Sequence, residues 1–525
     1  MGQEIRALLF AGLALAIGLA LPAEPARGQS NAAPAEPGVF EVLLRPVRDG
    51  GTEVTAIAVR ATIRGGELAG DERLRLTAPV VYAGVPGIAD RVEDLQVTDR
   101  HGIVPLSAED GPAAPGGFPY FRHWTAGRDV SFPVRITYRS RVQPVGAPGG
   151  PPFGIRPTDG GVSGAGSGFL VIPENAGTTS SQVEWDLSDL QNGSLAATSF
   201  GDGDFSLDGP AARLMQGWYM AGPAGRFPAD GDIENFSATW LGVPPWNPAI
   251  TMAQTADIYG YLGEAFAYLG EAPRYRVFVR ILETPPFGGG TALTDSFMLS
   301  RGPAGADDED DDPQGLLFHE MIHGFVGGIE GPGGVTSWFS EGLTSYYTTQ
   351  LQLRGGYWSL QDYIERINFV AEEYYTNPAR NWSAERIVEV GFSDNFIRHL
   401  PYRRGELYFA DLDSRLRAAS GGARDLDTLI EAVFLRRKGG WTFDHDAWRS
   451  VLERELGPEA VAMFDAVVLD GTQTLAPAPD AFGPCLSREP AIYERGGETF
   501  QGYRWVRAGG VSDSECAGAS NARHR

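Results

Sequence analysis

The pattern of apolar residues changes once along this chain, near residue 245, and this change constrains the fold more than any other feature. Before it, short runs such as 40–45 and 130–138 alternate apolar and polar residues and are separated by Gly, Pro, Asn and Asp. Alternation with period two, interrupted by turn residues, is typical of antiparallel sheet. We therefore expect a β-rich domain over residues 29–244.

After the change, apolar residues recur at helical spacing. Ile258, Leu262, Phe266 and Leu269 lie three or four positions apart, which is the period of an amphipathic helix. The same spacing continues in the segments 358–373, 405–420 and 426–437. We expect an α+β chain in which a mainly helical domain at 245–470 follows the β-rich one.

Two stretches lack either period. Residues 146–168 are rich in Gly and Pro, so we expect a long loop or a break between two β halves there. Residues 471–525 are also rich in Gly and Pro, with a few strand-like residues around Cys485 and Cys516. We expect this C-terminal tail to hold a disulfide, which in the chain-entropy model would stabilise by roughly 3 to 4 kcal/mol. Two unpaired thiols are the alternative.

The segment His319-Glu320-Met321-Ile322-His323 carries the clearest chemical signal. On a helix, residues four positions apart project from the same face, so both imidazoles can bind one metal ion. The residues before and after it are apolar, and Gly327-Gly328 follows, which is a helix-ending signal. A buried helix that presents two histidines is therefore expected.

A second motif supplies a third ligand. Residues 338–347 read W-F-S-E-G-L-T-S-Y-Y, and we expect them to start a second helix that is capped by Thr336 or Ser337. Glu341 then lies in its first turn, where its carboxylate can reach the first helix. Two His and one Glu leave a fourth position for water, as in catalytic zinc sites. The ligand types favour Zn²⁺, with cobalt and manganese as alternatives.

These motifs resemble the glycyl aminopeptidase family of gluzincin metallopeptidases, whose pattern is W-F-x-E-G-x-T-x-Y-Y. A third patch, Pro401-Tyr402-Arg403-Arg404-Gly405, is similar to the Y-x-K-G segment of that family and of aminopeptidase N, with Arg404 where Lys is usual. The resemblance implies a thermolysin-like zincin catalytic domain behind the N-terminal antiparallel β domain. It also implies that Tyr402 stabilises the oxyanion through its phenol.

Site chemistry then suggests a mechanism. Zinc lowers the pKa of a bound water to about 7, and Glu320, close to the metal without being a ligand, can take the proton of the attacking water. The expected activity is hydrolysis of peptide bonds in peptide or protein substrates. An inactive, peptidase-like binding protein is the alternative from another class, but His319, Glu320, His323, Glu341 and Tyr402 are all present.

The substrate-binding segment departs from the family pattern. Residues 287–297 resemble the edge strand along which such enzymes bind peptide backbone, and Gly288, Gly289 and Gly290 would permit close approach. The family usually has G-G-L-E-H here, where the acid can meet the α-ammonium group of the substrate. This stretch contains no Glu, only Asp295, so an endopeptidase is the alternative to the aminopeptidase we favour.

The first residues resemble an export signal. An uninterrupted apolar run from Ala7 to Leu21 precedes Ala26-Arg27-Gly28, which is the layout of a signal peptide with small residues at its cleavage site. We expect cleavage after Gly28 and a periplasmic or extracellular protein without stable membrane insertion, with an uncleaved anchor as the alternative.

Charge excludes one class of partner. The net charge is −24, from Lys+Arg 43 and Asp+Glu 67, so the chain should repel nucleic-acid backbones. The acidic run at 307–312 is expected to be a solvated loop, with calcium binding as the alternative.

Overall fold

The computed structural model describes residues 37–68, 72–114, 119–144, 146, 152–285, 287–305, 313–391 and 394–509. The chain forms two compact units, and the division falls within helix α1 (Pro248–Ala265). Residues up to Asp257 and from Pro273 to Gln314 form the first unit, and Ile258–Ala272 with the chain from Gly315 onward form the second. The predicted domain boundaries at 29–244, 245–470 and 471–525 stay predictions.

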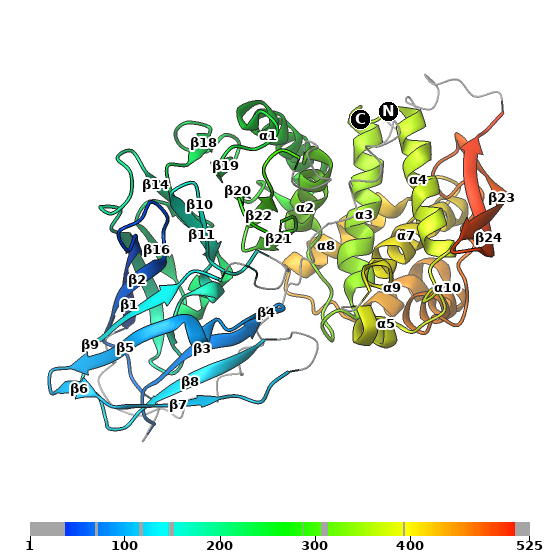
Figure 1. Cartoon of the computed structure of the whole chain (residues 1–525). Helices are drawn as coiled ribbons and strands as arrows, with labels where there is room; N and C mark the ends of the chain where they lie inside the picture. The colour runs from blue at the N-terminus through cyan, green and yellow to red at the C-terminus, as the bar shows by residue number, and fades with distance from the viewer. Residues whose placement is uncertain are drawn as a thin grey trace. The chain divides into compact units, whose positions relative to one another are not determined.

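The first unit contains four sheets (Figure 1). The largest has seven strands in the order β16 (Phe205–Asp208), β13 (Thr178–Trp185), β1 (Gly38–Val47), β2 (Ala56–Arg64), β9 (Val134–Arg141), β5 (Val92–Asp99) and β6 (Gly102–Val104). A second sheet has β12 (Ile172–Pro173), β3 (Arg75–Tyr82), β8 (Tyr120–Ala126) and β7 (Leu106–Asp110), with β4 (Val85–Pro86) paired to β3.

The alternation predicted from the sequence accounts for these two sheets. In β1, buried and partly exposed residues alternate along the whole strand, so one face packs inward while the other is nearer the solvent. The inward side chains Phe40, Val42 and Leu44 join Leu76 of β3 and Ile136 of β9 in one apolar core. The prediction of antiparallel sheet is confirmed here, although β1 and β13 pair in parallel.

The third sheet runs β10 (Arg156–Thr158), β11 (Gly161–Ala165), β17 (Trp218–Gly222), β14 (Leu195–Thr198) and β15 (Gly201–Asp202). It corrects one prediction, because 146–168 is not simply a loop: β10 and β11 lie within it. Glycine conceals the strand, since a Cβ at Gly161 would lie 2.6 Å from the carbonyl oxygen of Ala221 and one at Gly164 2.8 Å from Ile155. β11 is buried, and its side chains are small because the neighbouring chain segments approach it closely.

The fourth sheet runs β18 (Gly225–Phe227), β19 (Phe236–Leu241), β20 (Tyr275–Ile281), β22 (Ser296–Arg301) and β21 (Gly290–Leu293). Within it, β20 is buried throughout and parallel to both neighbours. β21 is the edge strand and pairs antiparallel with β22, so the segment expected to be an edge strand is one.

The second unit is mainly helical. Helices α2 (Gln314–Val326), α3 (Ser337–Arg354), α4 (Leu360–Tyr375), α5 (Ala384–Gly391), α6 (Asn395–Arg398), α7 (Leu400–Ala419), α8 (Leu426–Lys438), α9 (His445–Leu456) and α10 (Pro458–Phe464) follow in order. A short π-helical turn, η7 (Asp465–Leu469), leads to a hairpin of β23 (Leu486–Arg495) and β24 (Glu498–Arg507). The predicted helical register from 358 to 437 is confirmed by α4, α7 and α8. None of the helices in the described part of the chain has the length and apolarity that crossing a membrane requires.

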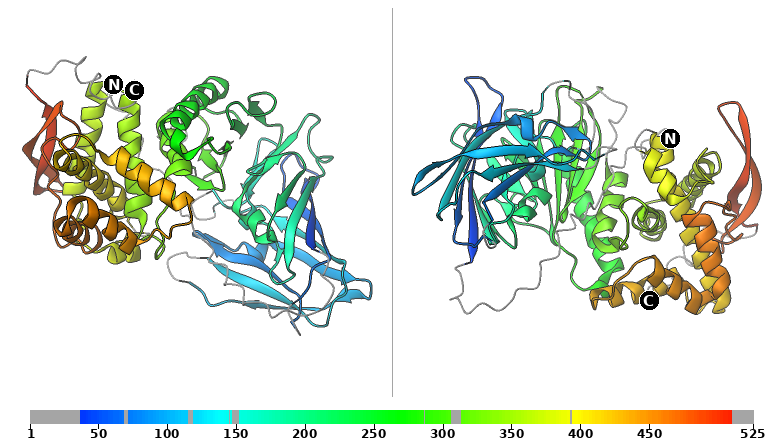
Figure 2. Two further views of the ribbon diagram at one scale, coloured as in Figure 1. Left: turned by 180° about the vertical axis from the view of Figure 1, so that it is seen from behind. Right: turned by 90° about the horizontal axis from the view of Figure 1, so that it is seen from below.

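The C-terminal hairpin is more extensive than the sequence suggested and packs on α4, as both views in Figure 2 show at the edge of this unit. Asn368 of α4 bonds the backbone of Trp505 twice, at 2.8 and 2.7 Å. Cys485 is disulfide-bonded, and the chain's only other cysteine is Cys516. Cys516, the acidic run 307–312 and the predicted signal at 1–28 lie outside the described residues.

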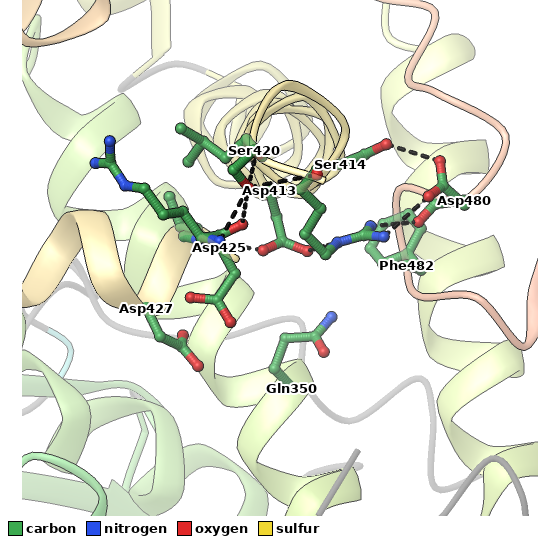
Figure 3. Close-up of polar contacts among 12 residues, drawn as sticks. Gln350, Asp413, Ser414, Ser420, Asp425, Asp427, Asp480 and Phe482 are labelled. Carbon is green, nitrogen blue, oxygen red and sulfur yellow. Dashed lines mark hydrogen bonds and ion pairs between the residues drawn. The ribbon is translucent and has the colours of Figure 1, made fainter. Parts of the chain in front are cut away.

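Polar contacts fix the end of α7 to the segments that follow it (Figure 3). Ser414 donates a hydrogen bond of 2.7 Å to Asp480 of the C-terminal segment. Asp413 accepts the backbone N–H of Leu426, at 2.9 Å, at the start of α8. The acidic residues in this region therefore serve as caps and anchors of α7 and α8.

Candidate metal centre and active site

Helix α2 presents the two histidines because its opposite side is apolar. Leu317, Phe318, Met321 and Ile322 are all buried, so the helix is fixed within the core of the second unit. The rings of His319 and His323 lie with centroids 5.0 Å apart and nearly perpendicular. The helix ends at Val326, and Gly327 follows with a φ of 61°, as the Gly-Gly signal predicted.

Glu341 of α3 joins this pair. Its Oε2 atom lies 3.2 Å from Nε2 of His323 and 3.5 Å from Nε2 of His319. The three residues offer one ligand atom each, all within 4.8 Å of one another. The structure thus brings together the three residues that the sequence predicted as metal ligands.

Five side-chain atoms where α2 meets α3 have no hydrogen-bond partner within the described residues. They are Nε2 of both histidines, Oε2 of Glu341 and both carboxylate oxygens of Glu320. A buried polar atom without a partner costs about 1 to 3 kcal/mol, and a divalent cation would satisfy the two imidazoles and the carboxylate together. The residues present therefore fit a metal ion held by two His and one Glu.

The environment keeps His319 neutral and Glu341 ionised, and these are the protonation states that bind a metal ion. Burial lowers the pKa of His319 to about 4, so its imidazole is neutral at pH 7. Burial alone would raise the pKa of Glu341, but the charge of His323 and the close approach of both imidazoles lower it to about 2. Burial would lower the pKa of His323, but the charge of Glu341 raises it instead.

Glu320 has a different environment from Glu341. It is fully buried, and burial raises its pKa to about 8, with the nearby Glu341 charge acting in the same direction. A carboxyl group with a pKa close to neutrality is suited to accept and return a proton.

Tyr402 lies on α7 beside the histidines. Its ring stacks on that of His319 with centroids 6.1 Å apart. Burial raises the pKa of its phenol well above the ordinary value, so the hydroxyl remains protonated and can donate a hydrogen bond. The structure therefore places Tyr402 in the same cluster as the two histidines and Glu341.

Two glycines bring α3 and α7 close enough for this arrangement. A Cβ on Gly342 would lie 2.5 Å from the Cα of Gly405, and a Cβ on Gly405 would lie 2.5 Å from the carbonyl oxygen of Trp338. Gly342 follows Glu341 directly, and Gly405 lies one turn after Tyr402. The glycines of the two motifs therefore touch each other, which explains why each motif contains one.

Arg404, in the position where the family has Lys, is directed away from the cluster. It is buried and donates hydrogen bonds to the backbone carbonyls of Val468, Arg380 and Trp382, at 2.9 to 3.1 Å. Its role in the structure is therefore to join η7 to the segment after α4.

Sequence reasoning missed three residues of the cluster. His399 packs edge-on against Tyr402 with centroids 5.4 Å apart, and burial lowers its pKa to about 3. Thr344 and Thr348 of α3 contact the histidines of α2. The signal for the threonines was a four-residue spacing that matches the spacing of the two histidines.

The residues predicted to bind substrate belong to the first unit. Gly288 and Gly289 have φ of 77° and 85°, in the left-handed region that favours glycine, and Gly290 begins β21. Asp295 lies in the turn between β21 and β22 with a φ of 47°, and its carbonyl accepts the N–H of Arg276 at 3.0 Å. Its side chain is exposed.

Comparison with known proteins agrees with this arrangement. Residues 333–394 match the family model of M61 glycyl aminopeptidase, and this match includes Glu341. No curated protein matches the chain.

One solved structure with a TM-score above 0.5 shares the fold, and two others are similar at lower TM-scores. An aminopeptidase N family protein from Idiomarina loihiensis is 15% identical, with a TM-score of 0.63, over 86% of this chain and 79% of that one. An M1 zinc metallopeptidase from Deinococcus radiodurans bound to a Tyr-Ser-Ala substrate is 15% identical, with a TM-score of 0.47, over 84% of this chain and 95% of that one. Yeast LTA4 hydrolase in complex with bestatin is 12% identical, with a TM-score of 0.49, over 86% and 72% of the two chains.

The predicted fold class and the predicted resemblance are confirmed by the first of these structures and by the family match. The family match at residues 333–394 identifies the chain as a hydrolase, a metallopeptidase of aminopeptidase type that resembles the glycyl aminopeptidase gluzincins.

Proposed function

We propose that this chain is an exported zinc aminopeptidase in which His319, His323 and Glu341 hold the metal. One observation carries the proposal: three buried ligand atoms from two helices converge within 4.8 Å and lack hydrogen-bond partners in the described chain. Two imidazoles with one carboxylate are the ligand set of catalytic zinc, which keeps a fourth position open.

When bound, zinc acts as a Lewis acid on water and on the scissile carbonyl. The residues of the chain perform the proton transfers. Glu320, buried beside the three ligand residues, takes a proton from the attacking water as a carboxylate and gives it to the amine that leaves. Tyr402, protonated because burial raises the pKa of its phenol, donates a hydrogen bond to the oxyanion.

The test is hydrolysis of a peptide series by the mature protein before and after metal removal. Chelation should abolish activity, and stoichiometric Zn²⁺ should restore it. Glu320→Gln should still bind zinc but lose most of its activity, because the base is removed while the ligands remain. Hydrolysis that survives complete chelation would contradict the proposal, and zinc binding without any hydrolysis would favour an inactive binding protein.

A zinc endopeptidase of the same fold is the second candidate, favoured by the absence of Glu from residues 287–297. In the aminopeptidase, we propose that Gly288, Gly289 and Gly290 admit the peptide backbone and that Asp295 meets its α-ammonium group. Matched peptides with free and N-acetylated termini distinguish the two. An aminopeptidase should cleave only the free peptide, and Asp295→Asn should raise its KM, whereas an endopeptidase should cleave both.

Export is a separate part of the proposal and rests on the apolar run Ala7–Leu21 and on the small residues before position 29. N-terminal sequencing of the protein recovered outside the cytoplasm should begin at Gln29. A protein that retains Met1 at the membrane would support the uncleaved anchor.

A further inference from the structure

Two threonines follow Glu341 on α3 with the same four-residue spacing as the histidines on α2. Oγ1 of Thr344 lies 3.2 Å from Nδ1 of His323, and Oγ1 of Thr348 lies 3.3 Å from Nδ1 of His319. Both threonines are buried. Each histidine therefore has one nitrogen toward the convergent ligand atoms and the other nitrogen against a hydroxyl of α3.

The direction of one of these hydrogen bonds follows from a proton count. A hydroxyl has a single hydrogen, and Thr348 donates its own to the carbonyl of Thr344 at 2.8 Å. The Thr348 oxygen can then only accept from His319. The Nδ1 atom of His319 must therefore carry a proton, since two lone pairs would otherwise face each other at this distance.

This count determines the tautomer of the imidazole. A neutral histidine has one N–H and one lone pair. If Nδ1 holds the proton, Nε2 holds the lone pair, and Nε2 is the atom that lies 3.5 Å from Glu341 without a hydrogen-bond partner in the described chain. The chain of bonds from the Thr344 carbonyl through Thr348 to His319 thus prepares a ligand atom.

We propose that Thr348 is a positioning residue that holds His319 as its Nδ1–H tautomer for metal binding. The inference rests on the proposed metal centre. Metal-bound histidines usually donate their second N–H to a carboxylate, a backbone carbonyl or water. In this chain a threonine hydroxyl, whose own proton is bonded to its helix, performs that task.

The test compares zinc affinity among three variants of the full-length mature protein. Thr348→Val keeps the shape of the side chain and removes the hydroxyl, whereas Thr348→Ser keeps the hydroxyl. Thr255→Val is the matched control, because Thr255 of α1 is also buried and donates to the carbonyl four residues earlier, Thr251, at 2.8 Å. Thr255→Val therefore removes the same type of hydrogen bond within a helix, at a residue that contacts neither proposed histidine ligand.

Zinc titrated into metal-free protein against a competing chelator gives the dissociation constant. Thr348→Val should raise it about 10-fold or more, the usual effect of losing such a partner. Thr348→Ser and Thr255→Val should bind zinc as the wild type does. Wild-type affinity in Thr348→Val would overturn this inference alone, whereas a wild type that binds no zinc would overturn the proposed function as well.

A second readout already gives a decisive result on the wild type. Nitrogen chemical shifts of the histidines in metal-free wild-type protein report which ring nitrogen carries the proton. His319 should be the Nδ1–H tautomer, and Thr348→Val should shift it toward a mixture with the Nε2–H form. A wild-type His319 protonated at Nε2 alone would overturn the inference.

Discussion

The contact between Gly342 and Gly405 allows a quantitative prediction, because both residues lie inside helices. A Cβ on Gly342 would lie 2.5 Å from the Cα and 3.0 Å from the carbonyl carbon of Gly405. Carbon atoms in contact normally lie about 3.5 to 4.0 Å apart. Gly342→Ala must therefore separate α3 and α7 by about 1 Å at their crossing.

Two effects of this substitution have opposite signs. In an open helical position, Gly→Ala stabilises by up to about 1 kcal/mol through helix propensity. Overpacking a filled contact destabilises by about 1 to 3 kcal/mol, and here the atoms that must move are backbone. The net change in the free energy of unfolding should therefore be a loss, with the steric term outweighing propensity.

The same displacement should reduce activity. Glu341 precedes Gly342, and Tyr402 lies one turn before Gly405, so separating the helices moves a proposed ligand and the proposed oxyanion donor apart. A misplacement of about 1 Å can lower the rate about 100-fold. Peptide hydrolysis and zinc content, measured on the same preparation, separate loss of the metal from loss of geometry.

Gly391→Ala is the control for stability. Gly391 ends α5, and a Cβ there would meet its nearest atom, Cα of Arg398, at 3.4 Å, which is an ordinary contact. Denaturant unfolding should show Gly391→Ala at least as stable as the wild type and Gly342→Ala clearly less stable. A Gly342→Ala protein as stable and as active as the wild type would show that the glycine contact does not set the separation of α3 and α7.

Three further predictions concern proton, oxyanion and disulfide chemistry. Between pH 4.5 and about 8, Glu320 is protonated in the folded metal-free protein but ionised in the unfolded chain, so the free energy of unfolding should fall as pH rises. Glu320→Gln should remove this pH dependence from unfolding measurements. An unchanged pH dependence in Glu320→Gln would contradict the assignment to Glu320. Tyr402→Phe should lower kcat more than it changes KM, and an unchanged kcat would remove Tyr402 from the mechanism. Cys485→Ser should lower the free energy of unfolding by about 3 to 4 kcal/mol, and equal denaturation midpoints would show that the disulfide adds nothing to stability.

The local part of the site could be predicted from the sequence. The four-residue spacing of His319 and His323 determines their common face on any helix, and the second motif needed only a helix to present Glu341. These predictions depend on backbone geometry within one element, which sequence spacing encodes.

The remaining residues of the site depend on how three helices pack. Thr348 is one of several threonines in its segment, and only the alignment of α3 against α2 identifies the histidine that it contacts. His399 had no paired spacing, and the ring that it packs against is known only once α7 is placed. Packing between helices is set by many side chains at once and leaves no short sequence pattern.

The same contrast holds for the fold. Strands with alternating burial, such as β1, were predictable, whereas β11 was not, because its glycines reflect close neighbours rather than a turn. The C-terminal hairpin was expected only as isolated strand-like residues, since its pairing across two glycines, Gly496 and Gly497, is visible only when both strands are aligned.

The central claim is that one divalent ion is bound where the two helices meet. Anomalous diffraction at the zinc edge, from crystals of the zinc-loaded protein, tests it most directly. One strong peak per chain is expected, in contact with Nε2 of His319, Nε2 of His323 and a carboxylate oxygen of Glu341. A peak elsewhere, or one with Glu341 turned away from it, would mean that these three residues do not form the metal site.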